Sequence, residues 1–334
     1  MKSLFDKTEL KNKELKNRVF RSATYLNLAK DTGEINSEII SVYREYAKGQ
    51  IGGIITGIAT VHPEDEKVDG MLEFHNDTLA AKHIELTEAV HEEGSLIFLQ
   101  IGIVDLHTHG LETVTNIPKE EINKLTDLFK DAAIRAENAG YDGVQIHAAH
   151  FLFLSKFISP LYNNRSDEYG QNSNSKILID ILGKIKSVVS EDFIISIKIN
   201  CSDFMEGGLM EEDFISICKV LNENGMDLFE VSGNSPSRPI IQDASNEAYF
   251  KDSGVKLKNE IDAPIILTGG HRSIENMERI LNETDIEYLG ISRPFLYEPH
   301  LIRRWSNNNL KPSKCISYNF CYKTPGHDCV YKFG

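Results

Sequence analysis

The chain has 334 residues, 41% of them hydrophobic, and its 36 basic and 50 acidic residues give a formal net charge of −14. The hydrophobic content excludes disorder over most of the chain, and no apolar run approaches the roughly 20 residues of a membrane-spanning helix. The acidic balance argues against a nucleic-acid partner, because phosphate groups require a basic surface.

The N-terminal residues and the cysteines bear on location. Residues 1–10 are charged and lack the apolar core of a secretory signal. The five cysteines are odd in number, which favours reduced thiols over a disulfide framework. We therefore expect a cytoplasmic protein with neither a nucleic-acid nor a membrane partner.

Apolar strand-like runs alternate with amphipathic helical runs along the whole chain. In chain order, the expected strands are residues 18–23, 53–60, 95–101, 143–147, 193–200, 228–232, 264–268 and 287–291. The expected helices are residues 37–48, 77–92, 119–139, 173–189, 211–223, 247–258, 273–281 and 299–307. The strands are rich in Ile and Val and lack polar alternation, which is typical of a parallel sheet buried on both faces.

Eight such strand–helix units favour a TIM (β/α)8 barrel over a doubly wound sheet. We expect one domain over residues 1–334, with no composition break inside it. Residues 2–16 form a short N-terminal extension, expected as a hairpin that closes the bottom of the barrel. Residues 308–334 form a loop-rich tail that carries Cys315, Cys321 and Cys329. In such barrels the chemistry lies at the C-terminal ends of the strands.

Glycines and an arginine follow the last two expected strands. Gly269 and Gly270 come after the seventh strand, and Ser292 and Arg293 come after the eighth. Backbone N–H groups at such glycines, together with a guanidinium, suit a phosphate group. These loops therefore predict a phosphate site, with ordinary turns as the alternative.

Three further side chains end strands. Lys198 interrupts an apolar strand, so we expect its ammonium to face the barrel mouth as a Schiff-base lysine, a phosphate ligand or a cation beside an electron-rich ring. His147 and His150 would bind a metal ion or donate two hydrogen bonds to a carbonyl or anionic oxygen.

A metal-dependent hydrolase is a weaker alternative. Asp105, His107 and His109 have the spacing of such enzymes, but they follow the third strand and no aspartate ends the eighth. In the tail, three cysteines are one short of a tetrahedral set of ligands. No metal site is therefore expected.

These motifs together resemble the old yellow enzyme family of FMN-dependent oxidoreductases, particularly the NADH:flavin oxidoreductases related to the barrel half of 2,4-dienoyl-CoA reductases. The resemblance rests on residues 15–19, 52–57, 98–100, 140–150, 157–170, 269–270 and 292–294. It covers nearly the whole chain in the right order.

The resemblance implies FMN across the barrel mouth, with its phosphate on Gly269, Gly270, Ser292 and Arg293. Gln100 would pair with the pyrimidine edge of the flavin, and Lys198 would face its N1 side. The dimethylbenzene and N5 side would be lined by Ala23, Thr24, Tyr25 and Gly57. His147 and His150 would grip the carbonyl oxygen of an enone or the amide of nicotinamide.

The function implied is a ping-pong NAD(P)H oxidoreductase acting on a small electron-poor molecule such as an α,β-unsaturated carbonyl, with the chain in a homo-oligomer. Leu152 stands where the family often has a proton-donating tyrosine, which leaves Tyr25 as a candidate acid. The alternative is therefore an NADH oxidase or electron carrier with poor alkene reduction. Tyr318 stands where one of the four cluster cysteines of relatives would be, which disfavours an iron–sulfur cluster.

Overall fold

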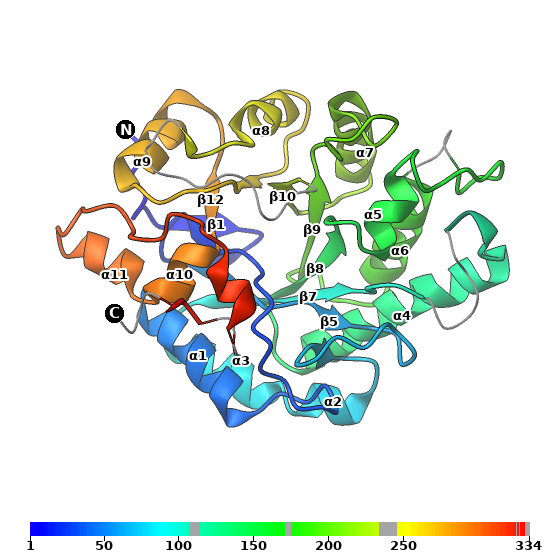
Figure 1. The fold of residues 1–334 in the computed structure, drawn as a ribbon, viewed down its shortest axis with the longest axis horizontal. Helices are drawn as coiled ribbons and strands as arrows, with labels where there is room; N and C mark the ends of the chain where they lie inside the picture. The colour runs from blue at the N-terminus through cyan, green and yellow to red at the C-terminus, as the bar shows by residue number, and fades with distance from the viewer. Residues whose placement is uncertain (107–113, 171–174, 234–245, 325, 327, 331–334) are drawn as a thin grey trace.

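The computed structural model describes residues 1–106, 114–170, 175–233, 246–324, 326 and 328–330. Within these ranges, eight parallel strands close a barrel (Figure 1). The barrel strands are β3 (Val19–Arg21), β4 (Gly53–Ile55), β7 (Leu96–Gly102), β8 (Gly143–Ala148), β9 (Ile194–Asn200), β10 (Leu228–Ser232), β11 (Ile265–Leu267) and β12 (Tyr288–Ile291). Each strand pairs with the next, and β12 pairs back onto β3. The predicted TIM barrel is confirmed.

Helices surround the strands in an outer layer (Figure 1). They are α1 (Ser37–Lys48), α2 (Asp77–Ala81), α3 (Ile84–His91), α4 (Lys119–Asn138), α5 (Phe153–Ile158), α6 (Lys176–Lys186), α7 (Glu211–Glu223), α8 (Lys251–Lys258), α9 (Ile274–Glu283), α10 (Arg293–Tyr297) and α11 (Leu301–Ser306). The apolar faces of these helices and the outward side chains of the strands form one large buried core.

Two expected elements are interrupted. The strand expected over residues 53–60 divides into β4 and β5 (Ala59–Thr60), and between them the Gly57 N–H donates to the Tyr43 hydroxyl at 2.8 Å. The helix expected over residues 77–92 divides into α2 and α3, where His83 is buried and its Nδ1 lies 2.6 Å from the Tyr141 hydroxyl. At Gly57 the backbone N–H bonds to a side chain instead of a neighbouring strand, and at His83 the side chain ties the junction of the two helices to the loop before β8. Strand β6 (Leu72–Glu73), which pairs with β5, was not expected.

The N-terminal extension forms the predicted hairpin. Strands β1 (Thr8–Leu10) and β2 (Lys13–Leu15) pair antiparallel, and Lys11 and Asn12 between them have φ of 46° and 64°. Positive φ at both central residues is the signature of a tight hairpin turn whose twist matches the strands. Leu10 and Leu15 are buried in a cluster with inward side chains from the barrel strands, so the hairpin plugs the barrel end opposite the carboxyl ends of the strands.

The C-terminal tail runs back over the barrel beside α10 and α1, as the red segment of Figure 1 shows. Its start is held where the Ser313 N–H donates to the carbonyl of Arg272 at 2.8 Å, and Asn319 accepts a hydrogen bond from Arg293. The tail therefore forms part of the wall at the C-terminal end of the strands. None of the helices in the described ranges is both long and apolar enough to span a membrane.

Candidate active site

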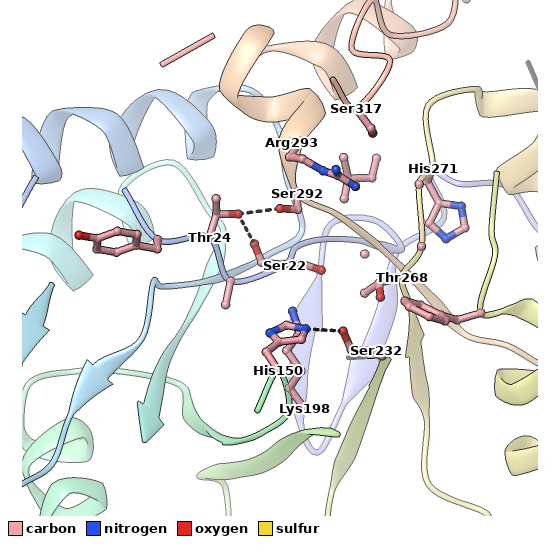
Figure 2. A pocket seen from close by; sticks show the side chains of 18 of the residues that line it. Ser22, Thr24, His150, Lys198, Ser232, Thr268, His271, Ser292, Arg293 and Ser317 are labelled. Carbon is pink, nitrogen blue, oxygen red and sulfur yellow. Dashed lines mark hydrogen bonds between the residues drawn. The ribbon is translucent and has the colours of Figure 1, made fainter. Parts of the chain in front are cut away.

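A cavity of about 300 Å³ opens at the C-terminal ends of the barrel strands (Figure 2). Its lining includes the predicted site residues Ala23, Thr24, Tyr25, Gln100, His147, His150, Lys198, Gly269, Gly270, Ser292 and Arg293. Gly57 is the predicted residue that does not line it, and lies instead beside a smaller cavity with Tyr43. Residues far apart in the sequence thus meet in one site because barrel closure brings every strand end to the same opening.

One side of the cavity is built from the loops after β11 and β12. Gly269 and Gly270 have φ of 117° and 83°, a region that side chains rarely allow. A Cβ on Gly269 would lie 3.2 Å from both Tyr249 and Phe250. The Arg293 Nη2 lies 3.4 Å from the Tyr249 hydroxyl, so the guanidinium is anchored beside the two glycines.

Ser292 completes this side of the cavity. Its hydroxyl lies 2.8 Å from the Thr24 hydroxyl on the loop after β3, as Figure 2 shows. Together the glycine backbone, the Ser292 hydroxyl and the Arg293 guanidinium supply neutral and charged donors around one space. This donor set fits a phosphate group.

The floor of the cavity carries a chain of four buried polar side chains. Gln100 Nε2 donates to Gln145 Oε1 at 2.7 Å, and Gln145 Nε2 donates to Glu230 Oε2 at 2.8 Å. Glu230 Oε1 lies 2.9 Å from the ammonium of Lys198. Lys198 and Gln100 reach the cavity, whereas Glu230 is completely buried beneath them. Lys198 is therefore held by an ion pair.

His147 and His150 stand next to Lys198, with ring centroids 5.2 Å apart. His147 Nδ1 accepts the Ala149 N–H at 3.3 Å, which leaves the proton on Nε2. His150 Nε2 lies 2.9 Å from the Ser232 hydroxyl (Figure 2), and the His150 backbone has a φ of 63°. The positive φ turns the chain sharply after β8, so that both rings face the same opening.

Both histidines are neutral. Burial, helped by the nearby Lys198 cation, lowers the pKa of His147 to about 3 and holds the pKa of His150 well below its usual range. Neutral imidazoles offer N–H donors rather than transferable protons at ordinary pH. The pair therefore suits hydrogen bonding to a carbonyl or anionic oxygen.

Tyr25 and Leu152 both line the cavity. The Tyr25 hydroxyl donates to the main-chain oxygen of Asp69 and to Asn27 Oδ1 at 3.2 Å, two groups that do not line this cavity. Burial and the Asp69 carboxylate raise the pKa of Tyr25. The side chain of Leu152 has no exchangeable proton, so neither residue presents an easily lost proton here.

Asp105, another candidate for metal binding, does not line this cavity. Asp105 is ion-paired with Lys156, and His107 and His109 lie outside the described residues. Within the described part of the chain, no three histidine, cysteine or acidic side chains are grouped so as to hold a metal ion.

Cys315, Cys321 and Cys329 line a second cavity of about 330 Å³, which adjoins the first at Arg293 and Cys315. Tyr318, in the fourth position, stacks on Phe320 with ring centroids 5.7 Å apart and is 42% exposed. Burial raises the pKa of Cys315 and of Cys321. The residues present do not fit a four-cysteine iron–sulfur cluster.

The structure adds cavity residues that the sequence patterns did not single out. These are Tyr249 and Phe250, which follow β10 in the chain. Ser232, which also lines the cavity, stands at a strand end that the sequence predicts. Glu230 was missed although it lies, like Lys198, within an apolar strand, and that similarity was the available signal. Only the pairing register, which sets Glu230 opposite Lys198, joins the two.

Comparisons with known proteins bear on this site. The model of the NADH:flavin oxidoreductase / NADH oxidase family matches residues 3–115 and 104–311. An NADH oxidase of Thermoanaerobacter brockii is 29% identical, in a match that covers 95% of this chain and 53% of that protein. An NADPH dehydrogenase of Bacillus subtilis is 28% identical, covering 90% of this chain and 94% of that protein. The chain thus spans about half the length of the first relative and nearly all of the second.

Solved structures share the barrel. The old yellow enzyme homologue of Zymomonas mobilis matches with a TM-score of 0.77 and 20% identity, covering 93% of this chain and 94% of that one. The likeness in fold agrees with the family match over most of the sequence. The chain belongs to the NADH:flavin oxidoreductase / NADH oxidase family of flavin-dependent enzymes, as its resemblance to the old yellow enzymes implied.

Proposed function

We propose that the chain is an FMN-dependent NAD(P)H oxidoreductase of the ene-reductase type, working by a ping-pong mechanism. The observation that carries this proposal is the cavity itself, which joins an anion-binding wall, a polar floor and two neutral histidines. When bound, FMN would take a hydride from reduced nicotinamide at N5 and give it to an electron-poor acceptor such as an α,β-unsaturated carbonyl.

Different lining residues would bind different parts of FMN. Gly269, Gly270, Ser292 and Arg293 would bind the phosphate group, because they supply convergent donors. Gln100 and Lys198 at the floor would bind the pyrimidine edge, and Ala23 and Thr24 would line the remaining side of the ring system. Gly57 would act through the loop after β4 rather than by touching the ring, because the Gly57 N–H is bonded to Tyr43.

His147 and His150 would position the second substrate. His147 would donate from Nε2 to a carbonyl oxygen, and His150 would donate from Nδ1 with its Nε2 accepting from the Ser232 hydroxyl. These bonds would polarise the carbonyl and favour hydride addition at the β-carbon. The same donors would hold the amide oxygen of nicotinamide in the first half of the cycle. Neither ring needs to change its protonation state in these roles.

The source of the proton for the acceptor distinguishes an efficient ene-reductase from an enzyme that reduces alkenes poorly. Leu152 cannot supply the proton, and the Tyr25 hydroxyl is directed to Asp69 and Asn27, so the proton would come from water. This observation favours a second candidate, an NADH oxidase or electron carrier that reduces alkenes poorly. The two candidates differ in which acceptor reoxidises the protein.

We also propose a cytoplasmic location, a small-molecule substrate and a homo-oligomeric state. The odd number of cysteines favours thiols over a disulfide framework, which supports a reducing compartment. The oligomer rests on the family resemblance, and the molecular mass in solution tests it.

A reduction and reoxidation experiment tests the function. The purified protein is loaded with FMN, and its flavin absorbance is followed anaerobically as NADH or NADPH is added. Ene-reduction requires bleaching by a nicotinamide and rapid recovery with an enone. Recovery with oxygen but not with the enone would favour the second candidate, and a protein without bound FMN would refute both.

A further inference from the structure

We infer that Glu230 is a positioning residue that sets the charge and the hydrogen-bond polarity of the cofactor floor. The inference rests on the proposed binding of FMN in this cavity. It adds a role for a residue that does not itself touch the cavity, together with Gln145, which connects Glu230 to Gln100.

The charge of the cavity floor depends on a buried ion pair. Lys198 and Glu230 lie opposite each other on β9 and β10, with ammonium and carboxylate 2.9 Å apart and both side chains nearly or fully buried. A lone ammonium at the floor would strongly favour the negative charge that flavin acquires on reduction. The adjoining carboxylate offsets much of that field, because the pair has no net charge. Glu230 therefore tunes how easily the bound flavin is reduced.

Glu230 also sets the direction of the hydrogen bonds between Gln145 and Gln100. An ionised carboxylate only accepts hydrogen bonds, so Gln145 must turn its NH2 group toward Glu230 and its oxygen toward Gln100. Gln100 must then use its own NH2 group as the donor to Gln145, at 2.7 Å. This leaves Gln100 Oε1 as an acceptor for a ligand, which suits the imide N–H of a flavin. Glu230 thus fixes the orientation of an amide two side chains away.

The discriminating measurement is the midpoint potential of bound FMN in equilibrium with a reference dye. E230Q should shift the equilibrium about tenfold or more toward reduced flavin, equivalent to about +30 mV for two electrons. K198Q should shift it in the opposite direction, because an unopposed carboxylate remains. The double variant K198Q/E230Q should lie between them, near the wild type.

S196A is the matched control. Ser196 lies two residues before Lys198 on β9, is fully buried and donates to the carbonyl of Val144 at 2.9 Å, outside the chain of four side chains. S196A should leave the potential unchanged. Q145L tests the hydrogen bonds between Gln145 and Gln100, since it should weaken FMN binding by about tenfold although Gln145 does not line the cavity.

The outcomes separate this inference from the proposed function. A wild-type protein that binds no FMN would overturn both. Bound FMN with the same potential in E230Q and the wild type, or with shifts of the same sign in E230Q and K198Q, would overturn this inference alone. If E230Q loses FMN, the potentials of K198Q and K198Q/E230Q test the inference instead. The potential must be higher in the double variant, because the unpaired carboxylate has been removed, and equal potentials would overturn the inference.

Discussion

At the scale of single residues, the cavity combines strong hydrogen-bond donors with weak proton donors. His147 is neutral because burial lowers its pKa to about 3, and the lining residue Leu152 has no exchangeable proton. Under the proposed function, His147 would polarise an acceptor, and Leu152 could not protonate it. This imbalance makes Leu152 the most informative single position for the choice of acceptor.

Replacing Leu152 with tyrosine should add the missing acid. General acid catalysis by a positioned group contributes about 10²-fold or more, so we expect L152Y to speed reoxidation by an enone by at least tenfold. The measurement is the anaerobic rate of flavin reoxidation after mixing the reduced protein with an enone. L152F supplies the ring without the hydroxyl and should give no gain. Equal rates in L152Y and L152F would show that the proton enters elsewhere.

The buried histidines also make stability depend on pH. Burial lowers the pKa of His83 to about 3, so the folded chain excludes a proton that the unfolded chain binds below about pH 6.5. Keeping His83 neutral therefore costs nothing above pH 6.5, and the free energy of unfolding decreases as the pH falls below that value. At pH 5 the loss is about 2 kcal/mol for each such histidine.

Urea unfolding at pH 7 and pH 5 tests this dependence. In H83Q the difference in unfolding free energy between the two pH values should shrink by about 2 kcal/mol. Y141F removes the hydroxyl that His83 contacts at 2.6 Å but keeps the imidazole, and should keep the full difference. An unchanged difference in H83Q would contradict a neutral buried His83.

At the scale of elements, the loop after β11 depends on backbone that only glycine adopts readily. The φ of 117° at Gly269 and the 3.2 Å approach to Phe250 mean that alanine there is both strained and crowded. We expect G269A to weaken FMN binding at least tenfold and to cost about 1–3 kcal/mol of stability. Fluorescence titration with FMN and thermal unfolding measure the two effects.

Gly183 in α6 provides the control. A Cβ there meets no atom within 4 Å, and alanine favours a helix over glycine by about 0.5–1 kcal/mol. G183A should therefore stabilise the protein slightly and leave FMN binding unchanged. Equal FMN affinities in G269A and G183A would remove the loop after β11 from the cofactor site.

The long elements follow from the sequence because their hydrophobic period is unambiguous. Residues 37–48, 211–223 and 228–232 have the expected bounds, and the N-terminal hairpin lies where it was expected. The breaks near Gly57 and His83 depend on contacts with Tyr43 and Tyr141, which are distant in the sequence. The short helices α5 and α10 hold fewer than two turns, too few for a periodic pattern to emerge.

The sequence likewise predicts part of the site, namely the residues that stand at strand ends. Strand ends are visible in the sequence, so Gln100, His147 and Lys198 could be placed at one opening. The partnership of Lys198 with Glu230 needs the pairing register between β9 and β10, which no local pattern contains. The direction of the Tyr25 hydroxyl likewise depends on a loop more than forty residues away, the one that carries Asp69.

At the scale of the whole molecule, barrel closure turns scattered residues into one cavity. Thr24, after the first barrel strand, contacts Ser292, after the last, and the C-terminal tail adds Cys315 and Ser317 to the same wall. The net charge of −14 is a property of the whole chain, whereas Arg293 places positive charge where the phosphate group of an anionic cofactor would bind, and the ammonium of Lys198 is paired with Glu230. The global charge and the local charge of the site thus differ in sign.

Binding of FMN and its reduction by a nicotinamide can be measured together in an anaerobic titration of the FMN-loaded protein with NADH and, separately, with NADPH, followed by flavin absorbance. We expect stoichiometric FMN and complete bleaching by at least one nicotinamide. R293A should bind FMN at least tenfold more weakly, because a charge-assisted contact is lost. A protein that binds no FMN, or bound FMN that neither nicotinamide reduces, would contradict the proposed function.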